Sequence, residues 1–281
     1  MTVTTTRPPA DAPATAAPPG GPVRDRAAEY REAAYRDGPV AALLLLHGAT
    51  SPGVLPAGPG GHVFVPREIE ATCDRHQTHL GPRPRGGGTG ERRLGHVTVY
   101  GRELTALRVD GSGPPAGEPD GWATGLAWLR LGLAERLVDR VTAHLGGRTV
   151  QRTVTLNLPL VRAMLADAVA GTTECRALLK AVPAPYTLRR VHRSLDETGR
   201  TCLHLFGAAG FLAAGPGSEV RVSELLADTY APAADESAPR DGAAPTSGAP
   251  SSDGVSSAEG AAPNGLAAPT GYPSATDLER P

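Results

Sequence analysis

The sequence lacks the features that mark membrane, secreted or nucleic-acid-binding proteins. Its 281 residues have a formal net charge of −1, so no overall field favours a nucleic acid or a membrane surface. The longest aliphatic run, Val40–Leu46, is far too short to span a bilayer. The N-terminus has no charged and apolar blocks of a secretion signal. Three scattered cysteines form no disulfide framework. We therefore expect a cytoplasmic protein that binds neither nucleic acid nor membrane.

Lysine is almost absent. Lys180 is the only one, so arginine supplies nearly all of the positive charge. Together with 35 glycines and 28 prolines, this bias indicates a coding habit, and we draw no function from it.

Low-complexity segments at both ends leave about 200 residues to fold, enough for a substantial core. Residues 1–24 consist mainly of Thr, Pro, Ala and Gly, and residues 231–281 mainly of Ala, Pro, Ser, Gly and Asp. Such segments bury too little apolar surface to offset the entropy of the chain, so both are predicted to be disordered.

The first part of the remaining chain, residues 25–115, predicts a small and mostly β unit. A short helix is expected over 25–35, followed by a fully buried strand at Val40–Leu46, because a short aliphatic run is bounded there by turn residues. Further strands are expected at His62–Val65, His96–Tyr100 and Leu104–Val109, with Gly101-Arg102 as a tight connection between the last two.

The second part, residues 120–230, changes to helical periodicity. Apolar residues step by three or four from Leu126 to Leu145, again from Leu158 to Cys175, and again from Leu188 to Leu205. A shorter helix is expected over Glu219 to about Thr229. Long amphipathic helices joined by short links predict an antiparallel bundle, so the fold class is α+β.

Four short motifs occur in a defined order along this helical part. They are Gly132-Leu133-Ala134, then Arg148, then Leu165-Ala166-Asp167, then Gly207-Ala208-Ala209-Gly210-Phe211. Their order and spacing resemble those of the C-terminal helical domain of the acyl-CoA dehydrogenase family, preceded by the end of its middle β-domain. The resemblance covers about residues 40–230 and indicates a truncated and diverged member.

The resemblance implies a flavoprotein that acts on an acyl thioester carried on CoA or a carrier protein, in a metabolic or biosynthetic role. Arg148 corresponds to an arginine that reaches the FAD diphosphate of a neighbouring subunit. Gly207, Ala208 and Gly210 correspond to a glycine-rich turn against the cofactor, next to His204. These five residues are the predicted FAD contacts. The implied assembly is a homo-oligomer, or a hetero-oligomer with a full-length relative, with the helices at 126–145 and 188–205 in the contact.

Departures from the family pattern concern the chemistry. The N-terminal helical domain and the front of the middle domain have no counterpart. Where many members have Tyr-Glu-Gly with a catalytic glutamate, this chain has Tyr230-Ala231-Pro232, and the alternative position of the base falls at Trp122. Neither Ala231 nor Trp122 accepts a proton. Three acidic residues lie near these two positions in the sequence, namely Glu118, Asp120 and Glu224. One of them could replace the catalytic glutamate only if the backbone were displaced from its course in the family. No catalytic residue is therefore assigned.

Each predicted contact also has a purely structural explanation. Arg148 follows a helix end, where cations are favoured anyway. Gly207 suits an ordinary helix C-cap. For His204 a place in the core is favoured over a flavin contact.

Three further patterns do not support a site. Cys73, His76 and His79 have no fourth ligand nearby, so no metal is predicted. The glycine-rich 85–90 stretch lacks a phosphate-loop pattern. His192, Ser194 and Asp196 share one helix, which does not support a hydrolase triad.

Three functions remain open. The first is a degenerate acyl-CoA dehydrogenase-like flavoprotein that needs a partner chain. The second is a non-catalytic assembly subunit of a full-length dehydrogenase. The third is a non-redox enzyme that reuses the fold.

Overall fold

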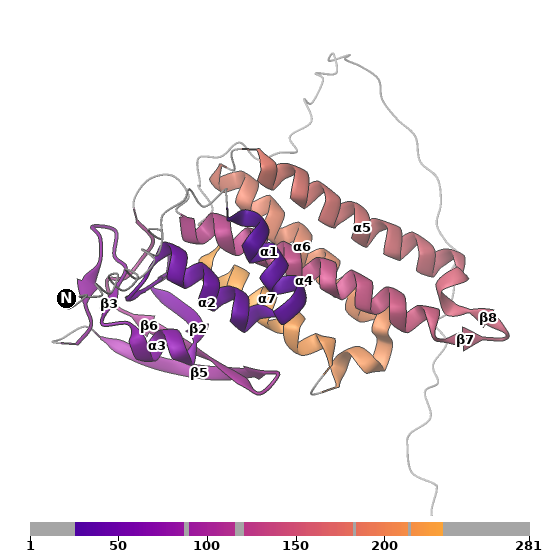
Figure 1. Cartoon of the computed structure of the whole chain (residues 1–281), viewed down its shortest axis with the longest axis horizontal. Helices are drawn as coiled ribbons and strands as arrows, with labels where there is room; N and C mark the ends of the chain where they lie inside the picture. Colours follow the sequence, from indigo (N-terminus) through magenta and orange to yellow (C-terminus); the bar gives the residue numbers. More distant parts are fainter. Residues whose placement is uncertain (1–25, 87–89, 116–120, 182–183, 213–214, 233–281) are drawn as a thin grey trace, which may run out of the picture. The chain divides into compact units, whose positions relative to one another are not determined.

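The computed structural model describes residues 26–86, 90–115, 121–181, 184–212 and 215–232. Helices dominate these ranges, and a small antiparallel sheet packs beside them (Figure 1). None of the helices described is long and apolar enough to cross a membrane. The α+β class predicted from the sequence is confirmed.

Four helices form the predicted antiparallel bundle. They are α4 (Gly121–Gly146), α5 (Pro159–Lys180), α6 (Pro185–Phe206) and α7 (Pro216–Tyr230). Helices α5, α6 and α7 each begin with proline in the first turn, where its missing N–H costs nothing. Helix α6 ends at Gly207, whose φ of 58° lies in the left-handed region that glycine adopts most easily.

Two helices precede the sheet, and the second of them corrects a prediction. Helix α1 (Ala27–Asp37) matches the expected short helix, whereas Val40–Leu46 belongs to helix α2 (Pro39–Thr50) and is not a strand. The run after Val40 contains only Ala and Leu, which are strong helix formers, and Pro39 starts it. Both helices pack on α4, so the segment predicted as β-structure extends the helical part of the molecule.

The sheet consists of three antiparallel strands in the order β2-β6-β5. They are β2 (His62–Pro66), β6 (Arg102–Val109) and β5 (Glu91–Val99). Tyr100 and Gly101 make the turn between β5 and β6, with φ of 49° and 73°, as in the two-residue turns that suit twisted hairpins. The turn therefore lies one residue earlier than predicted. Three two-residue strands, β1 (Val54–Leu55), β3 (Arg75–His76) and β4 (Arg83–Pro84), form a second small sheet.

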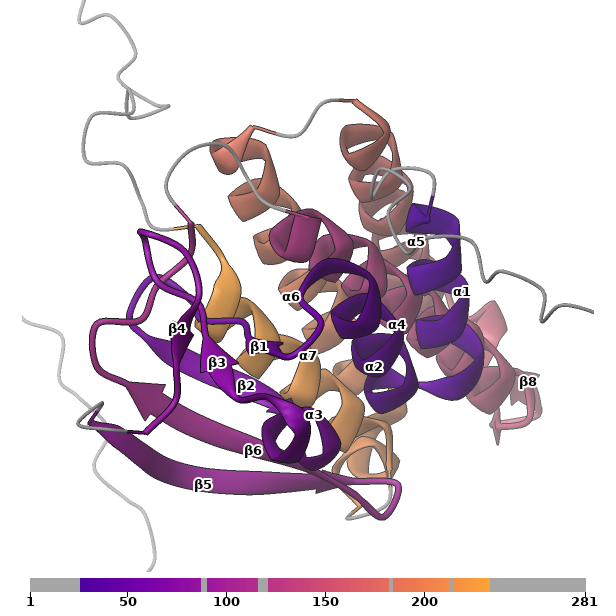
Figure 2. The ribbon, with the colours of Figure 1, turned by 60° about the vertical axis from the view of Figure 1, so that its left-hand side comes forward.

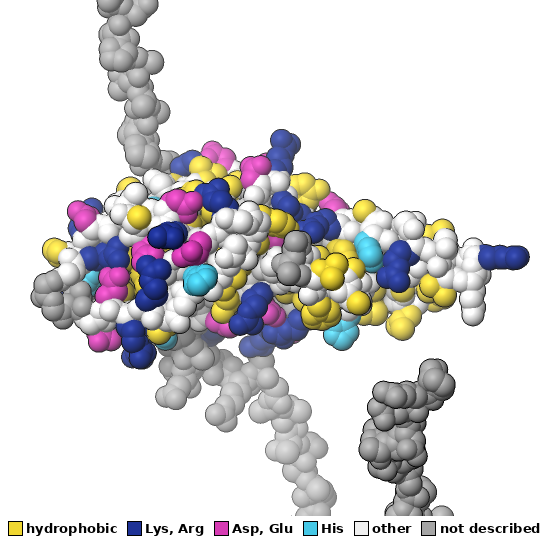
Figure 3. Space-filling model, turned by 90° about the horizontal axis from the view of Figure 1, so that it is seen from below, with side chains coloured by type: hydrophobic (Ala, Val, Ile, Leu, Met, Phe, Trp, Pro, Cys, Tyr) yellow, Lys and Arg dark blue, Asp and Glu magenta, His cyan; other side chains and the backbone are white. Residues whose placement is uncertain are grey.

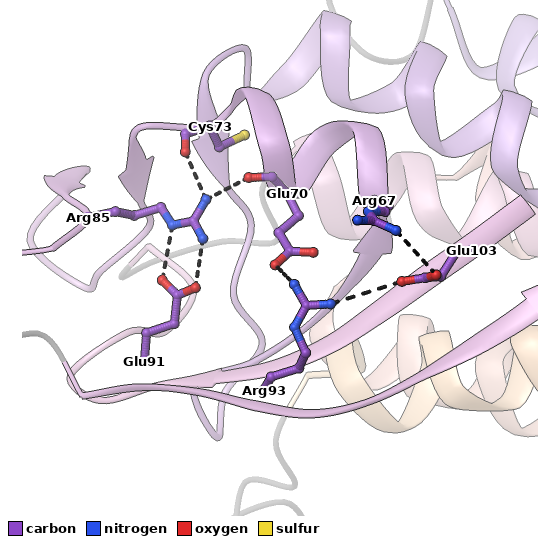
Figure 4. Close-up of polar contacts among 7 residues, drawn as sticks. All are labelled: Arg67, Glu70, Cys73, Arg85, Glu91, Arg93 and Glu103. Carbon is purple, nitrogen blue, oxygen red and sulfur yellow. Dashed lines mark hydrogen bonds and ion pairs between the residues drawn. The ribbon is translucent and has the colours of Figure 1, made fainter.

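Arginine–carboxylate pairs hold the short helix α3 (Arg67–Thr72) against the sheet (Figure 4). The Arg85 guanidinium donates to both Glu91 carboxylate oxygens, at 3.0 and 2.6 Å. Its remaining nitrogen donates to the carbonyl oxygens of Glu70 and Cys73, at 2.6 and 2.8 Å. Arg93 on β5 pairs with the Glu70 carboxylate. Backbone carbonyls at the end of α3 are satisfied in this way without a glycine cap.

Helix α7 joins the bundle to the sheet (Figure 2). Its apolar residues Val222, Leu226 and Tyr230 share one core cluster with Phe64 of β2 and Leu126 of α4. The Tyr230 hydroxyl also accepts a hydrogen bond from the Phe64 backbone N–H at 3.0 Å. The last residue of α7 is thereby fixed to the sheet.

Candidate functional site

The two positions where the family resemblance places a catalytic base lie together in the structure. Trp122, at the start of α4, contacts Tyr230, which directly precedes Ala231, with ring centroids 5.4 Å apart and an angle of 68° between the ring planes. Both rings are about 4% exposed. Edge-to-face packing of this kind is a favourable core arrangement. The neighbourhood of both base positions is therefore occupied by aromatic side chains.

No carboxylate bonds to this aromatic pair within the described residues. Besides accepting from Phe64, the Tyr230 hydroxyl donates towards the carbonyl oxygens of Phe64 and Pro56, at 3.3 and 3.4 Å. Burial raises the pKa of Tyr230, so it stays a neutral phenol. The Trp122 indole N–H has no partner in the described part of the chain.

Of the three acidic substitutes considered from the sequence, the structure describes only Glu224. Glu224 on α7 forms an ion pair with Arg200 of α6 at 3.0 Å. Glu118 and Asp120 lie outside the described residues.

The predicted FAD-contact segments meet at one end of the bundle. Arg148 follows α4, and one of its guanidinium nitrogens lies 3.4 Å from His144 Nε2. The His144 ring contacts Phe206, the last residue of α6, with centroids 5.3 Å apart. Arg148 is exposed and forms no ion pair with any described carboxylate. A guanidinium in this setting can bind an anion without first breaking a salt bridge.

The hairpin after Arg148 was not predicted from the sequence. Strands β7 (Thr149–Val150) and β8 (Thr153–Val154) pair across Gln151 and Arg152, which both have positive φ. The Arg148 carbonyl oxygen accepts from the backbone N–H and the hydroxyl of Thr155, at 2.8 and 3.1 Å. These bonds fix the backbone from which the Arg148 side chain projects.

The turn at 207–211 has structural explanations for its glycines. The Gly207 N–H donates to the carbonyl oxygens of Leu203 and His204, which is an ordinary helix C-cap. Gly210 is buried, and a Cβ atom there would lie 3.1 Å from Phe206 Cβ. Ala208 is exposed.

The preference for a core position at His204 is wrong, because this side chain is exposed. It sits on the outward face of the last turn of α6, opposite the buried Cys202 and Leu205. Whether His204, Ala208 and the two glycines contact a cofactor stays a prediction.

Exposed apolar side chains surround this end of the bundle. Val150 is 49% exposed, Leu160 72%, Phe211 73% and Leu212 65%. Figure 3 shows the molecule from below, and hydrophobic side chains gather on that face toward the end that carries the β7–β8 hairpin. By contrast, the apolar stripes of α4 and α6 are buried in the core of the chain itself. Whether other faces of these two helices contact a partner stays a prediction.

A buried polar network between α4, α6 and α7 was missed. Arg130 is fully buried, and its guanidinium donates to Asp196 Oδ1 at 2.5 Å, His192 Nδ1 at 2.7 Å and Ser223 Oγ at 3.0 Å. Burial lowers the pKa of His192 well below its ordinary value, and the Arg130 charge adds to this effect. Burial raises the pKa of Asp196, which Arg130 opposes. The spacing of four between His192 and Asp196 was the available signal, because it puts both on one face of α6.

Cys73, His76 and His79 do not converge on a common point. The Cys73 sulfur lies 3.4 Å from His47 Nε2, whereas the exposed His79 ring faces the Pro114 carbonyl oxygen. Burial raises the pKa of Cys73 to about 11, so it is a thiol. The described residues contain no group of three His, Cys, Asp or Glu side chains arranged to hold a metal ion.

Comparison with known proteins identifies the fold. No protein-family model matches the sequence, and no curated protein matches it. A Mycobacterium smegmatis protein assigned as an acyl-CoA dehydrogenase superposes with a TM-score of 0.53 at 13% identity, over 74% of this chain and 79% of that chain. A chain of the ChsE4-ChsE5 complex from Mycobacterium tuberculosis superposes with a TM-score of 0.50 at 14% identity, over 73% and 76%.

Glutaryl-CoA dehydrogenase from Mycobacterium smegmatis, in complex with FADH2, gives a TM-score of 0.42 at 16% identity, over 62% of this chain and 56% of that chain. The present chain thus spans little more than half the length of that enzyme. The first two superpositions show that the chain has the acyl-CoA dehydrogenase fold, as the sequence resemblance predicted.

Proposed function

We propose that this chain is a subunit of an acyl-CoA dehydrogenase-type assembly that contributes half of a flavin site and no catalytic base. The observation that carries the proposal is the Trp122–Tyr230 contact. General-base catalysis needs a proton acceptor within hydrogen-bond reach of the substrate carbon. At this position the chain has two buried aromatic rings and an alanine.

The proposal that the chain contributes to a flavin site rests on Arg148 and the residues near it at the end of the bundle. Arg148 is exposed, has no carboxylate partner among the described residues, and has His144 beside it. A planar guanidinium suits bidentate binding of a diphosphate. The residues thus fit the diphosphate of FAD. When bound, the flavin would supply the hydride acceptor for oxidation of an acyl thioester, while Arg148 would hold the diphosphate.

The need for a partner follows from what lies around Arg148. Contiguous exposed apolar surface on a folded chain commonly marks a protein interface. Val150, Leu160, Phe211 and Leu212 are exposed apolar residues in the segments that adjoin Arg148 and His204 along the chain at this end of the bundle. A second chain docked there would cover these residues and bring its own flavin to the arginine. That chain would be a second copy or a full-length relative.

The first test is an activity assay on the isolated chain. With saturated acyl-CoA and a dye as electron acceptor, we expect no reduction of the dye, because the described residues place no proton acceptor at either base position. Rapid dye reduction by the isolated chain would contradict the proposal.

The second test concerns the flavin. The tagged chain is isolated from its native cells, its partner is identified by mass spectrometry, and the co-expressed pair is examined for flavin absorbance. Arg148→Ala should weaken retention of FAD by about tenfold or more, the usual size of a lost charge-assisted bond. Arg193→Ala, which changes an exposed arginine in the middle of α6, is the matched control.

The remaining outcomes separate the alternatives. A partner complex without flavin would indicate the non-catalytic assembly subunit. A colourless chain that captures no dehydrogenase would favour the non-redox enzyme.

A further inference from the structure

A cavity of about 440 Å³ lies on the outside of the bundle between α1, α4 and α5. This volume is within the usual range for small-molecule sites. Its lining includes Ala27, Arg31, Trp128, Arg176, Leu179 and Lys180. It is a different place from the Arg148 end and from the Trp122–Tyr230 pair, and the proposed function does not use it.

Three cations and one carboxylate set the charge of this cavity. Arg31 of α1 and Arg176 of α5 both bond to the Glu135 carboxylate on α4, Arg31 through Nε at 2.5 Å. Glu135 is about 9% exposed. The carboxylate therefore fixes both guanidinium groups in place, and each keeps N–H donors beyond those spent on Glu135. Lys180 adds a third cation with no carboxylate partner in the described part of the chain.

The start of helix α1 adds to the positive field. Ala27 and Ala28, its first two residues, line the cavity, and no side-chain hydrogen bond caps this end of the helix. The first N–H groups of a helix and its dipole favour an anion. The apolar part of the lining consists of the Trp128 ring and Leu179, the latter on α5 beside Lys180.

The bridge through Glu135 also limits what the cavity can hold. Arg31 and Arg176 line a second hollow of about 290 Å³ on the other side of the bridge, together with Tyr35 and Val138. The Arg31–Glu135–Arg176 bridge thus divides the surface between α1 and α5 into two separate hollows. A docked helix needs a continuous groove, whereas a small molecule fits within one hollow.

We propose that this cavity binds a small amphipathic anion, with its carboxylate or phosphate among Arg31, Arg176 and Lys180 and its apolar part against Trp128 and Leu179. Burial of the apolar part supplies affinity, and the cations select for negative charge. Carboxylates and phosphate monoesters share this chemistry, and separate probes distinguish them.

The experiment uses Lys180 as a built-in reporter, because it is the only lysine of the chain. Reductive methylation with ¹³C-formaldehyde keeps its charge and gives one side-chain NMR signal besides that of the N-terminus. Octanoate, octyl phosphate and neutral octanol are then titrated into the full-length protein. We expect both anions to shift the Lys180 signal and octanol to bind about tenfold or more weakly. The tighter of the two anions identifies the head group.

Variants test the same point by calorimetry. Lys180→Gln and Arg176→Gln should each weaken octanoate binding by about tenfold and leave octanol binding unchanged. Arg200→Gln, on the exposed part of α6, is the matched control. Lys180→Gln changes an exposed residue in the last turn of α5, so the fold is retained even if Arg176→Gln unfolds.

Three results of the titrations would overturn the proposal. They are octanol binding as tightly as octanoate, octanoate binding that leaves the Lys180 signal in place, and failure of both anions to bind. A Lys180 signal that shifts with protein concentration alone would show that a second copy of the chain covers the cavity, which would also contradict it.

Discussion

Arg130 shows how a single residue can dominate the energetics of a core. A fully buried guanidinium is costly to desolvate, and its bonds to Asp196, His192 and Ser223 offset that cost. His192 must stay neutral to accept from Arg130, which agrees with the downward direction of its pKa. The network therefore fixes the registry of α4, α6 and α7 through one side chain.

Asp196→Ala tests this network. It leaves the Arg130 charge buried without a counter-ion, so we expect the free energy of unfolding to fall by about 3 kcal/mol or more. Urea denaturation monitored by circular dichroism measures the change. The double variant Arg130→Leu with Asp196→Leu should recover part of the loss, because both charges are gone. Glu174→Ala removes an exposed pair with Arg190 and should cost at most about 1 kcal/mol. Equal effects at the two sites would contradict the argument.

At the scale of elements, Glu219 connects three parts of the fold. This buried carboxylate at the start of α7 accepts from the Tyr100 hydroxyl of the β5–β6 turn at 2.7 Å and from Arg140 of α4 at 3.0 Å. Arg136 of α4 lies 3.3 Å away and stacks over the Tyr100 ring. The acidic residue also suits the positive end of the α7 dipole. The tip of the β-hairpin is thereby fixed to the bundle.

Glu219→Ala should release that hairpin. The two arginines lose their shared partner, and the Tyr100 hydroxyl loses its acceptor. We expect the free energy of unfolding to fall by about 3 kcal/mol. Amide hydrogen exchange should accelerate in Val97–Leu104 and stay unchanged in the middle of α5. The control is Arg102→Ala. It changes a residue of the same hairpin and removes only the exposed ion pair between Arg102 and Glu68 of α3. Uniform acceleration throughout the molecule would mean that Glu219 has no specific role at the hairpin.

The elements that were predicted correctly are those with a long or unambiguous period. The stripe from Leu126 to Leu145 predicts α4, and the glycine pair after it marks its end. Strands β2 and β6 were also found, because each is a short run of β-branched and other apolar residues bounded by turn residues. Val40–Leu46 failed because a short aliphatic run has no period to separate a buried strand from a buried helix. Helix α3 and the β7–β8 hairpin were missed because each is only a few residues long.

The site was less predictable than the fold. The resemblance puts the two base positions of the family at Trp122 and Ala231, but only the structure shows that the rings of Trp122 and Tyr230 are in contact. His204 was misplaced because one step along a helix decides between a buried and an exposed face. The cavity beside Lys180 has no sequence signature, since its walls come from three helices that are distant in sequence.

At the scale of the whole molecule, buried histidines couple stability to pH. Burial lowers the pKa of His47, His76 and His192 below the ordinary value of 6.5. The folded chain then holds fewer protons at these sites than the unfolded chain. Stability from these groups is complete above pH 6.5 and is lost as the pH falls toward their folded pKa values.

Urea midpoints measured from about pH 8 down to about pH 5 should therefore decrease below pH 6.5. Each histidine contributes at most about 1.4 kcal/mol per pH unit. His192→Gln keeps an acceptor for Arg130 and should flatten the profile. Burial raises the pKa of Asp196 above its ordinary value of 3.8. The folded chain therefore holds more protons at this site than the unfolded chain, so the contribution of Asp196 to stability increases as the pH falls toward 3.8. A midpoint that rises as the solution is acidified from pH 6.5 would exclude this account.

The contact between Trp122 and Tyr230 has a consequence for installing a base in the proposed assembly. Under the proposed function, Ala231→Glu alone would not give turnover, because the buried Trp122 and Tyr230 rings fill the space beside that position. Turnover would require several large buried residues to be replaced by smaller ones at the same time. Each single replacement would leave a cavity in the core and lower stability before activity increased.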